Sequence, residues 1–155
     1  MKASRIFLQA AVAFMGLGAL ALMLWVPPHE GRNADAALSA VYFKDPFLAY
    51  VYLGSLPFFY ALFQAFKVLG YIGRNEAFSP NTVKALRTIR RCALATAGLA
   101  AGAVISIRVT AGPAEDPAGF VMPGVFAVFA SLAAASAATV LENIVGSGLE
   151  KRSER

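Results

Sequence analysis

The sequence has few of the residues that build metal sites and covalent cross-links. It contains one cysteine, Cys92, and one histidine, His29, among 155 residues. A single cysteine excludes an intramolecular disulfide and a CxxC zinc site, and a single histidine excludes a multi-histidine metal site within one copy. Charged residues make up 15% of the chain, where about a quarter is usual in soluble domains. No paired acid and base or activated nucleophile is evident, so we expect a non-enzymatic protein without a cofactor.

Apolar residues are abundant and fall into four blocks. They make up 58% of the chain, the mean hydropathy is +0.61, and they concentrate at about residues 6–26, 47–69, 89–108 and 120–141. A helix rises about 1.5 Å per residue and the hydrocarbon core of a bilayer is roughly 30 Å thick, so each block can cross it. The sequence predicts an all-α membrane protein, a four-transmembrane-helix bundle in which residues 1–155 form a single integral membrane domain.

The first block shares features with a signal peptide. Lys2 and Arg5 precede it, and Ala34-Asp35-Ala36 could mimic a cleavage site. The apolar run is longer than a signal-peptide core of about 7–15 residues, and the cleavage-like site lies well beyond its end. We therefore expect a retained span.

Two prolines interrupt the predicted spans. Pro57 lies in the middle of the second block, where loss of one backbone hydrogen bond predicts a bend. Pro123 is expected in the first turn of the fourth span, where proline is tolerated. The polar mid-span residues, such as Gln9 and Gln64, are not ionisable, whereas transporters usually keep an acid or base in the membrane. Pro57 and Gln64 could still mark a bent, polar pathway.

The basic residues lie mostly on one side of the predicted spans. All lysines and arginines except Arg32, Lys44 and Arg108 fall in residues 1–5, 67–91 and 142–155. Cytoplasmic connections carry the excess of lysine and arginine. The pattern therefore predicts a multi-pass protein with both termini and the middle connection in the cytoplasm.

The stretch EAFSPNTVKALRTIRR, residues 76–91, joins the connection between the second and third spans to the third span. Ser79 is the expected N-cap, and Pro80 the first helical residue. Phe78 and Val83 have the spacing of a hydrophobic staple. Apolar and basic side chains then fall on neighbouring faces. The stretch predicts a cytoplasmic amphipathic basic helix that leads into span three.

This basic helix is expected to meet anionic headgroups, at about 1 kcal/mol per residue near the surface. A short basic patch beside a bilayer is typical of a topology anchor, so we expect no direct contact with nucleic acid. The candidate residues for contact with headgroups or a partner are Ser79, Lys84, Leu86, Arg87, Ile89, Arg90 and Arg91. Glu142, at the cytoplasmic end of span four, has two interpretations: a partner for Arg90 or Arg91, or a solvated helix end.

Gly98 and Gly102 form a GxxxG motif in the third span. Small residues let helix backbones approach closely in lipid. Ordinary packing within the four-helix bundle is the favoured interpretation, because small residues are frequent in this chain. A homo-oligomer interface is the alternative.

The segment GRNEAFSPNTVKALRTI resembles the motif of the DUF2975 family, small bacterial membrane proteins with four spans and no assigned function. The matching residues are Phe78, Ser79, Leu86, Arg87 and Ile89. The resemblance implies a location in the bacterial inner membrane. Members are often encoded beside a small helix-turn-helix regulator, which implies a cytoplasmic protein partner of that kind. Residues 141–155, LENIVGSGLEKRSER, match the family pattern only loosely.

The function that we expect is therefore an interaction or regulatory role at the cytoplasmic face. The alternative is a small transporter or channel subunit.

Overall fold

The computed structural model describes residues 2–25, 46–110 and 118–154, and these are helical almost throughout. The helices are α1 (Lys2–Trp25), α3 (Pro46–Gly73), α4 (Pro80–Thr110) and α5 (Ala118–Ser153). Each is long and apolar enough to cross a membrane. The predicted all-α architecture with four membrane spans is confirmed.

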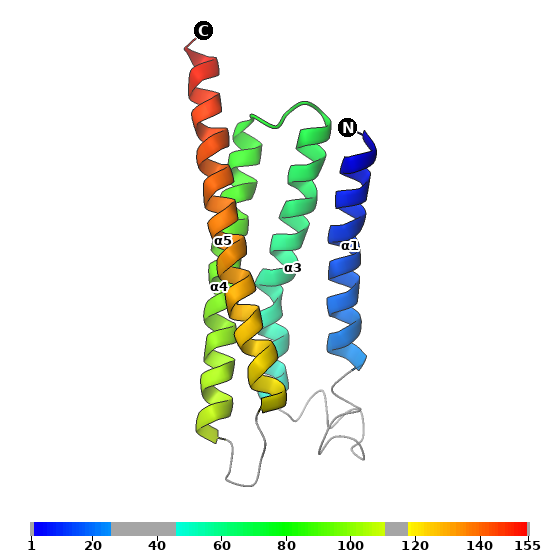
Figure 1. The fold of residues 1–155 in the computed structure, drawn as a ribbon, viewed down its shortest axis with the longest axis vertical. Helices are drawn as coiled ribbons and strands as arrows, with labels where there is room; N and C mark the ends of the chain where they lie inside the picture. Colours follow the sequence, from blue (N-terminus) through cyan, green and yellow to red (C-terminus); the bar gives the residue numbers. More distant parts are fainter. Residues whose placement is uncertain (1, 26–45, 111–117, 155) are drawn as a thin grey trace.

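The four helices lie side by side, and the described N-terminal end, the α3–α4 turn and the C-terminal end of α5 gather at one end of the molecule (Figure 1). The most extensive contact joins α4 to α5, followed by α3 to α4 and then α1 to α3. Each helix thus packs mainly on its neighbour in the chain. α1 is the least attached of the four.

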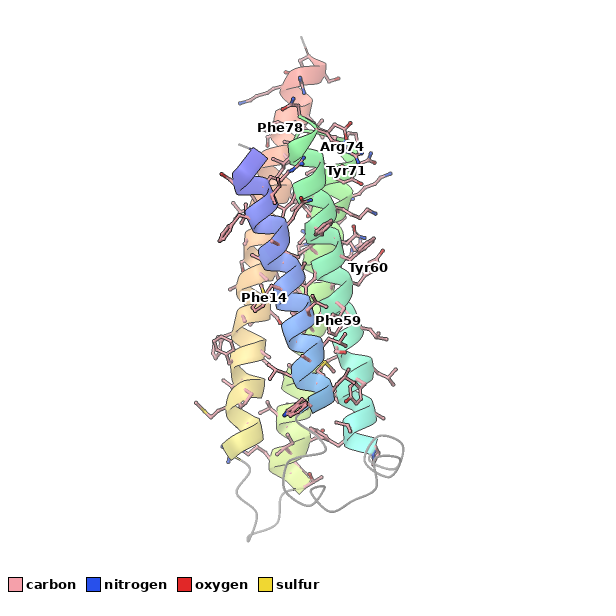
Figure 2. All side chains as sticks on the ribbon, turned by 90° about the vertical axis from the view of Figure 1, so that its right-hand side faces the viewer. Phe14, Phe59, Tyr60, Tyr71, Arg74 and Phe78 are labelled. Carbon is pink, nitrogen blue, oxygen red and sulfur yellow. The ribbon has the colours of Figure 1, made fainter. Side chains whose placement is uncertain are left out.

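The outer surface of the helices is more apolar than is usual for a protein surrounded by water. Phe14, Phe126 and Val109 are each at least three-quarters exposed, and large apolar side chains are exposed on every helix. Figure 2 shows such side chains pointing away from the helices, Phe14 among them. Exposed apolar surface of this extent identifies a membrane-facing protein. The chain is an integral membrane protein.

The contact between α4 and α5 is built from small side chains. Ala93 and Ala97 of α4 and Ala135 and Ala138 of α5 are buried. The Cγ2 methyl group of Val104 occupies the space that a side chain at Gly124 would need. Small residues let the two backbones approach closely, which gives van der Waals contact where lipid supplies no hydrophobic driving force.

α1 is held to α3 near both of its ends. The Tyr52 hydroxyl donates a hydrogen bond of 2.6 Å to the Met23 carbonyl. At the opposite end, the Arg5 side chain covers Gly73 and fills the space that a side chain at position 73 would take. A larger residue at position 73 would therefore displace the end of the Arg5 side chain.

Both prolines within the predicted spans, Pro57 and Pro123, lie inside helices. The bend expected at Pro57 stays a prediction. α3 begins at Pro46 and continues without interruption through Pro57. α5 begins at Ala118, so Pro123 lies in its second turn, and the prediction that Pro123 is in the first turn is wrong. The apolar block begins at Phe120, whereas the hydrogen-bonded helix extends beyond the block at both ends.

Candidate functional site

The connection between α3 and α4 is a closed turn with its own hydrogen bonds. Asn75 adopts a left-handed conformation, with φ of 61°. The Glu76 amide donates to the Tyr71 carbonyl at 2.9 Å, and the Asn75 amide to the Ile72 carbonyl at 3.2 Å. These two bonds form a Schellman motif, which satisfies the last carbonyls of α3. Asparagine tolerates the left-handed region better than most residues, so Asn75 fits this position. The two hydrogen bonds give the turn a defined geometry.

The start of α4 is held by a cap that includes the predicted Ser79. The Thr82 amide donates to Ser79 Oγ at 3.2 Å, the geometry of an N-cap. The Thr82 hydroxyl also donates to the Glu76 carbonyl at 3.1 Å and lies 3.1 Å from Ser79 Oγ. Thr82 is only 1% exposed, so these bonds are shielded from solvent. The cap and the Schellman motif together fix the α3–α4 turn.

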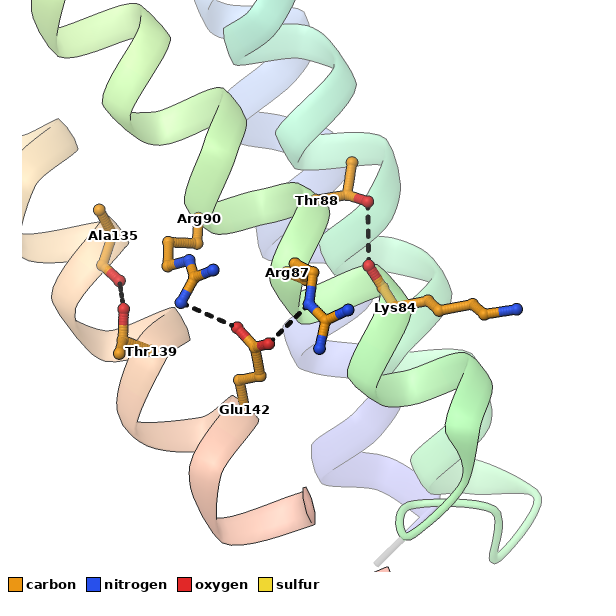
Figure 3. Close-up of polar contacts among 7 residues, drawn as sticks. All are labelled: Lys84, Arg87, Thr88, Arg90, Ala135, Thr139 and Glu142. Carbon is orange, nitrogen blue, oxygen red and sulfur yellow. Dashed lines mark hydrogen bonds and ion pairs between the residues drawn. The ribbon is translucent and has the colours of Figure 1, made fainter.

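A buried carboxylate joins α4 to α5 close to this turn. Glu142 Oε1 accepts a hydrogen bond from Arg87 Nε at 2.8 Å, and Arg90 Nη1 lies 3.3 Å from Glu142 Oε2 (Figure 3). The second contact is an ion pair without hydrogen-bond geometry, because Oε2 is buried and accepts no hydrogen bond. We call Arg87, Arg90 and Glu142 the charge cluster.

The exposure of the three side chains decides how the charge cluster behaves. The Glu142 side chain is 10% exposed, whereas those of Arg87 and Arg90 are 49% and 34% exposed. The carboxylate therefore depends on the arginines for its solvation, while the arginines still reach the surroundings. Removing partners from a buried charge costs more than removing the buried charge itself.

The charge cluster lies beside an apolar core in which three helices meet. Val68 of α3, Leu86 of α4 and Val145 of α5 are buried together, and Ile89 packs against them. One turn nearer the end of the molecule, the Phe78 ring lies against Gly148 of α5. This end of the molecule is thus tied together by an apolar contact, a charge cluster and a capped turn. Figure 2 labels Tyr71, Arg74 and Phe78 at this end.

The structure divides the predicted contact residues between four environments. Ser79 caps α4, and Leu86 and Ile89 belong to the apolar core. Arg87 and Arg90 hold Glu142. Lys84 and Arg91 are exposed and make no ion pair within the described residues.

Glu142 itself lies within α5, which continues to Ser153, so its interpretation as a solvated helix end is wrong. Its predicted pairing with Arg90 is confirmed. The structure adds Arg87 in place of Arg91.

The two glycines of the GxxxG motif have different surroundings. The Tyr50 hydroxyl of α3 lies 2.8 Å from the place of a Cβ atom at Gly102, and the same hydroxyl donates to the Leu99 carbonyl. No atom lies within 4 Å of the corresponding place at Gly98. Gly102 thus accommodates a neighbouring helix, and the homo-oligomer alternative for this motif stays a prediction.

In the described ranges no three His, Cys, Asp or Glu side chains gather as a metal site would require. His29 lies outside the described residues. The charge cluster holds its members in ion pairs, and the basic groups around it can contact anionic partners.

Comparison with known proteins gives a family and one curated relative. The family model described as "Protein of unknown function (DUF2975)" matches residues 31–155. The "Uncharacterized membrane protein YoaS" of Bacillus subtilis (strain 168) is 33% identical over 154 residues, which cover 99% of this chain and 96% of the relative. No solved structure matches the chain.

Proposed function

This chain belongs to the DUF2975 family of proteins of unknown function, and we propose that it docks a cytoplasmic protein onto the membrane. The docking surface is the basic end, which we define as the exposed side chains of Arg74, Lys84, Lys151 and Arg152. The observation that carries the proposal is that these cations sit on elements fixed to one another by the capped turn and the charge cluster.

Rigidity of the basic end supports a binding role. A surface that is ordered before binding loses less conformational entropy when a partner arrives. The α3–α4 turn is held by its Schellman motif and cap, and Glu142 ties α5 to α4 next to it. The basic end can therefore present its cations in a fixed arrangement, complementary to an acidic patch on a partner.

The length of α5 also supports docking. Residues 142–153 continue the helix beyond the predicted fourth span by roughly 18 Å, at about 1.5 Å per residue. The C-terminal end of α5 extends beyond the other helices (Figure 1). A helix that projects in this way offers a contact surface outside the bilayer.

The partner and the location form part of the proposal. The excess of lysine and arginine at the basic end favours a cytoplasmic position in a bacterial inner membrane. The family resemblance implies a small helix-turn-helix regulator as the partner. Membrane docking would then control where such a regulator resides, with no direct contact between this chain and nucleic acid.

Co-purification tests this proposal. The wild-type chain is cross-linked in native membranes, purified, and the bound proteins are identified by mass spectrometry. The double variant Arg74→Glu and Lys84→Glu reverses two cations of the basic end, and Arg108→Glu, at the other end of α4, is the matched control. We expect the double variant to lose its partner about tenfold or more, since like charges oppose docking, while R108E retains it. Recovery of the same proteins with wild type and double variant would contradict the proposal.

A second candidate is transport, and one observation favours it. Gln64 is 8% exposed and lies in the apolar part of α3, seven residues after Pro57. A buried amide in a span can mark a polar pathway. Solute flux into liposomes that Gln64→Leu abolishes would support this function, and flux unchanged by the substitution would exclude a role for Gln64.

A further inference from the structure

A shallow groove runs along the membrane-facing surface between α3 and α4. It has a volume of about 530 Å³ and is lined by Leu56, Pro57, Tyr60, Arg91, Cys92 and Ala95. Its exposed surface is almost entirely apolar, and Arg91 is the only charged residue among those that line it. The groove lies between two helices that are long and apolar enough to cross the membrane. Its open side therefore faces the acyl chains of the bilayer.

Two aromatic side chains of α3, Tyr60 and Phe63, connect this groove with a second cation, Lys67. Tyr60, Phe63 and Lys67 recur at helical spacing and share a face of α3. The Tyr60 and Phe63 rings have centroids 6.4 Å apart, and Lys67 Nζ lies 5.2 Å from the centroid of the Phe63 ring. This contact keeps the ammonium group of Lys67 over the Phe63 ring, on the face of α3 that carries Tyr60 of the groove.

The side chains of Arg91 and Lys67 lean in opposite directions along their helices, which brings their charged groups closer to the same depth in the bundle. Helical side chains lean toward the N-terminus of their own helix. α3 and α4 run antiparallel, so Arg91 leans toward the α3–α4 turn while Lys67 leans away from it. Arg91 thus lines the groove and leans toward the turn, and Lys67 approaches the same level from α3. Within the described residues neither cation is engaged by Glu142, which binds Arg87 and Arg90.

We propose that this groove binds one anionic phospholipid, with an acyl chain along Leu56, Pro57 and Ala95 and the phosphate between Arg91 and Lys67. An apolar trough that ends in positive charge is complementary to a molecule with an apolar chain and an anionic head. Arginine suits the phosphate because its planar fork donates two parallel hydrogen bonds. The site is independent of any protein partner at the basic end.

The observations favour a lipid over a soluble phosphate. The groove opens sideways within the spans, where a lipid arrives by diffusion in the bilayer. Only a lipid also fills the apolar trough, which a free ion leaves empty. Binding at a formed groove is saturable at one lipid per chain, unlike the general attraction of anionic headgroups to basic residues.

Cys92 provides a specific reporter, because it is the only cysteine of the chain and it lines the groove. The full chain is purified in a non-ionic detergent, and the rate of Cys92 alkylation by N-ethylmaleimide is measured with and without added lipid. The result is the ratio of the two rates within each variant, which removes direct effects of a substitution on the thiol. Phosphatidylglycerol is the anionic lipid, phosphatidylcholine the neutral one, and inorganic phosphate the soluble anion.

Four variants define the expected result. Arg91→Gln removes the groove cation, and Ala95→Phe fills the trough; Arg108→Gln and Ala133→Phe make the same changes at exposed positions elsewhere. We expect phosphatidylglycerol to protect Cys92 in the wild type and in both controls, and R91Q to weaken this protection about tenfold, the effect of losing one charge-assisted hydrogen bond. A95F should abolish protection. Native mass spectrometry should detect one retained phosphatidylglycerol per chain in the wild type.

Several results would overturn the proposal. These are equal protection by phosphatidylcholine, equal protection of R91Q and R108Q, or protection by inorganic phosphate alone at a level that A95F does not alter. Alkylation of the wild type at the same rate with and without phosphatidylglycerol would also exclude the site. The docking proposal is unaffected by any of these outcomes, because no residue of the basic end is changed.

Discussion

The charge cluster leads to a prediction about the order of two destabilising effects. Glu142→Gln removes the negative charge but keeps an oxygen that can accept from Arg87. The double variant Arg87→Gln and Arg90→Gln instead leaves Glu142 buried without a cation. The two changes remove the same ion pairs, yet they leave different groups without a partner.

The exposed fractions of the three side chains determine how much each change should lower the free energy of unfolding. A charge-assisted hydrogen bond contributes roughly 1 kcal/mol more than a neutral one, and the pair with the partly exposed Arg90 adds about 0–1 kcal/mol. Glu142→Gln should therefore lower the free energy of unfolding by about 1–2 kcal/mol, because half-exposed arginines can find water or headgroups. A buried carboxylate that loses its partners costs about 3–5 kcal/mol. The double arginine variant should be less stable than E142Q by about 2 kcal/mol.

The assay is reversible unfolding by sodium dodecyl sulfate in mixed micelles, followed by circular dichroism. Glu150→Gln on the exposed part of α5 and Lys84→Gln on the exposed face of α4 are matched controls, each expected to change stability by less than about 0.5 kcal/mol. If E142Q proves as destabilising as the arginine pair, the carboxylate does not depend on Arg87 and Arg90 for its solvation, and the reasoning is refuted.

Three further predictions concern the turn, the glycine pair and the topology. Asn75→Gly should preserve or raise stability, whereas Asn75→Val should lower it by about 1–2 kcal/mol, because only the first fits a positive φ; equal melting temperatures would contradict this. Gly102→Ala should push the Tyr50 hydroxyl away from Leu99 and lower the free energy of unfolding by about 1 kcal/mol in the same micelles. Gly98→Ala should leave this free energy unchanged or raise it. The reverse order would show that Gly98 is the packed position. A reporter active only in the periplasm and fused after Glu76 should be silent, and activity there would overturn the proposed orientation.

Local features of the sequence predicted local features of the fold. Four apolar blocks of spanning length predict four helices, and each helix contains the described part of one block. Ser79-Pro80 predicted the start of α4, because an N-cap and the following proline act within one turn of the backbone. Thr82 and Asn75 are not among the residues predicted from the sequence. A threonine three residues after a cap serine and an asparagine just past a predicted span are signals for them.

Features that depend on helices meeting could not be predicted in the same way. Arg87 and Glu142 are 55 positions apart, and no periodicity within α4 distinguishes Arg87, Arg90 and Arg91 as partners for Glu142. Gly98 and Gly102 belong to one motif, yet only Gly102 faces Tyr50 of another helix. The burial of Glu142 likewise follows from how closely α4 and α5 approach.

The neighbour-on-neighbour packing of the helices has a consequence for how the protein is made. The α3–α4 hairpin closes through a turn of six residues, 74–79, so it can form as soon as both helices have left the ribosome. α5 then adds to a surface already in place, and no helix must wait for a distant part of the chain. Contacts between chain neighbours bring a small loop-closure cost and favour rapid folding. The order of synthesis can therefore serve as the order of assembly in the bilayer.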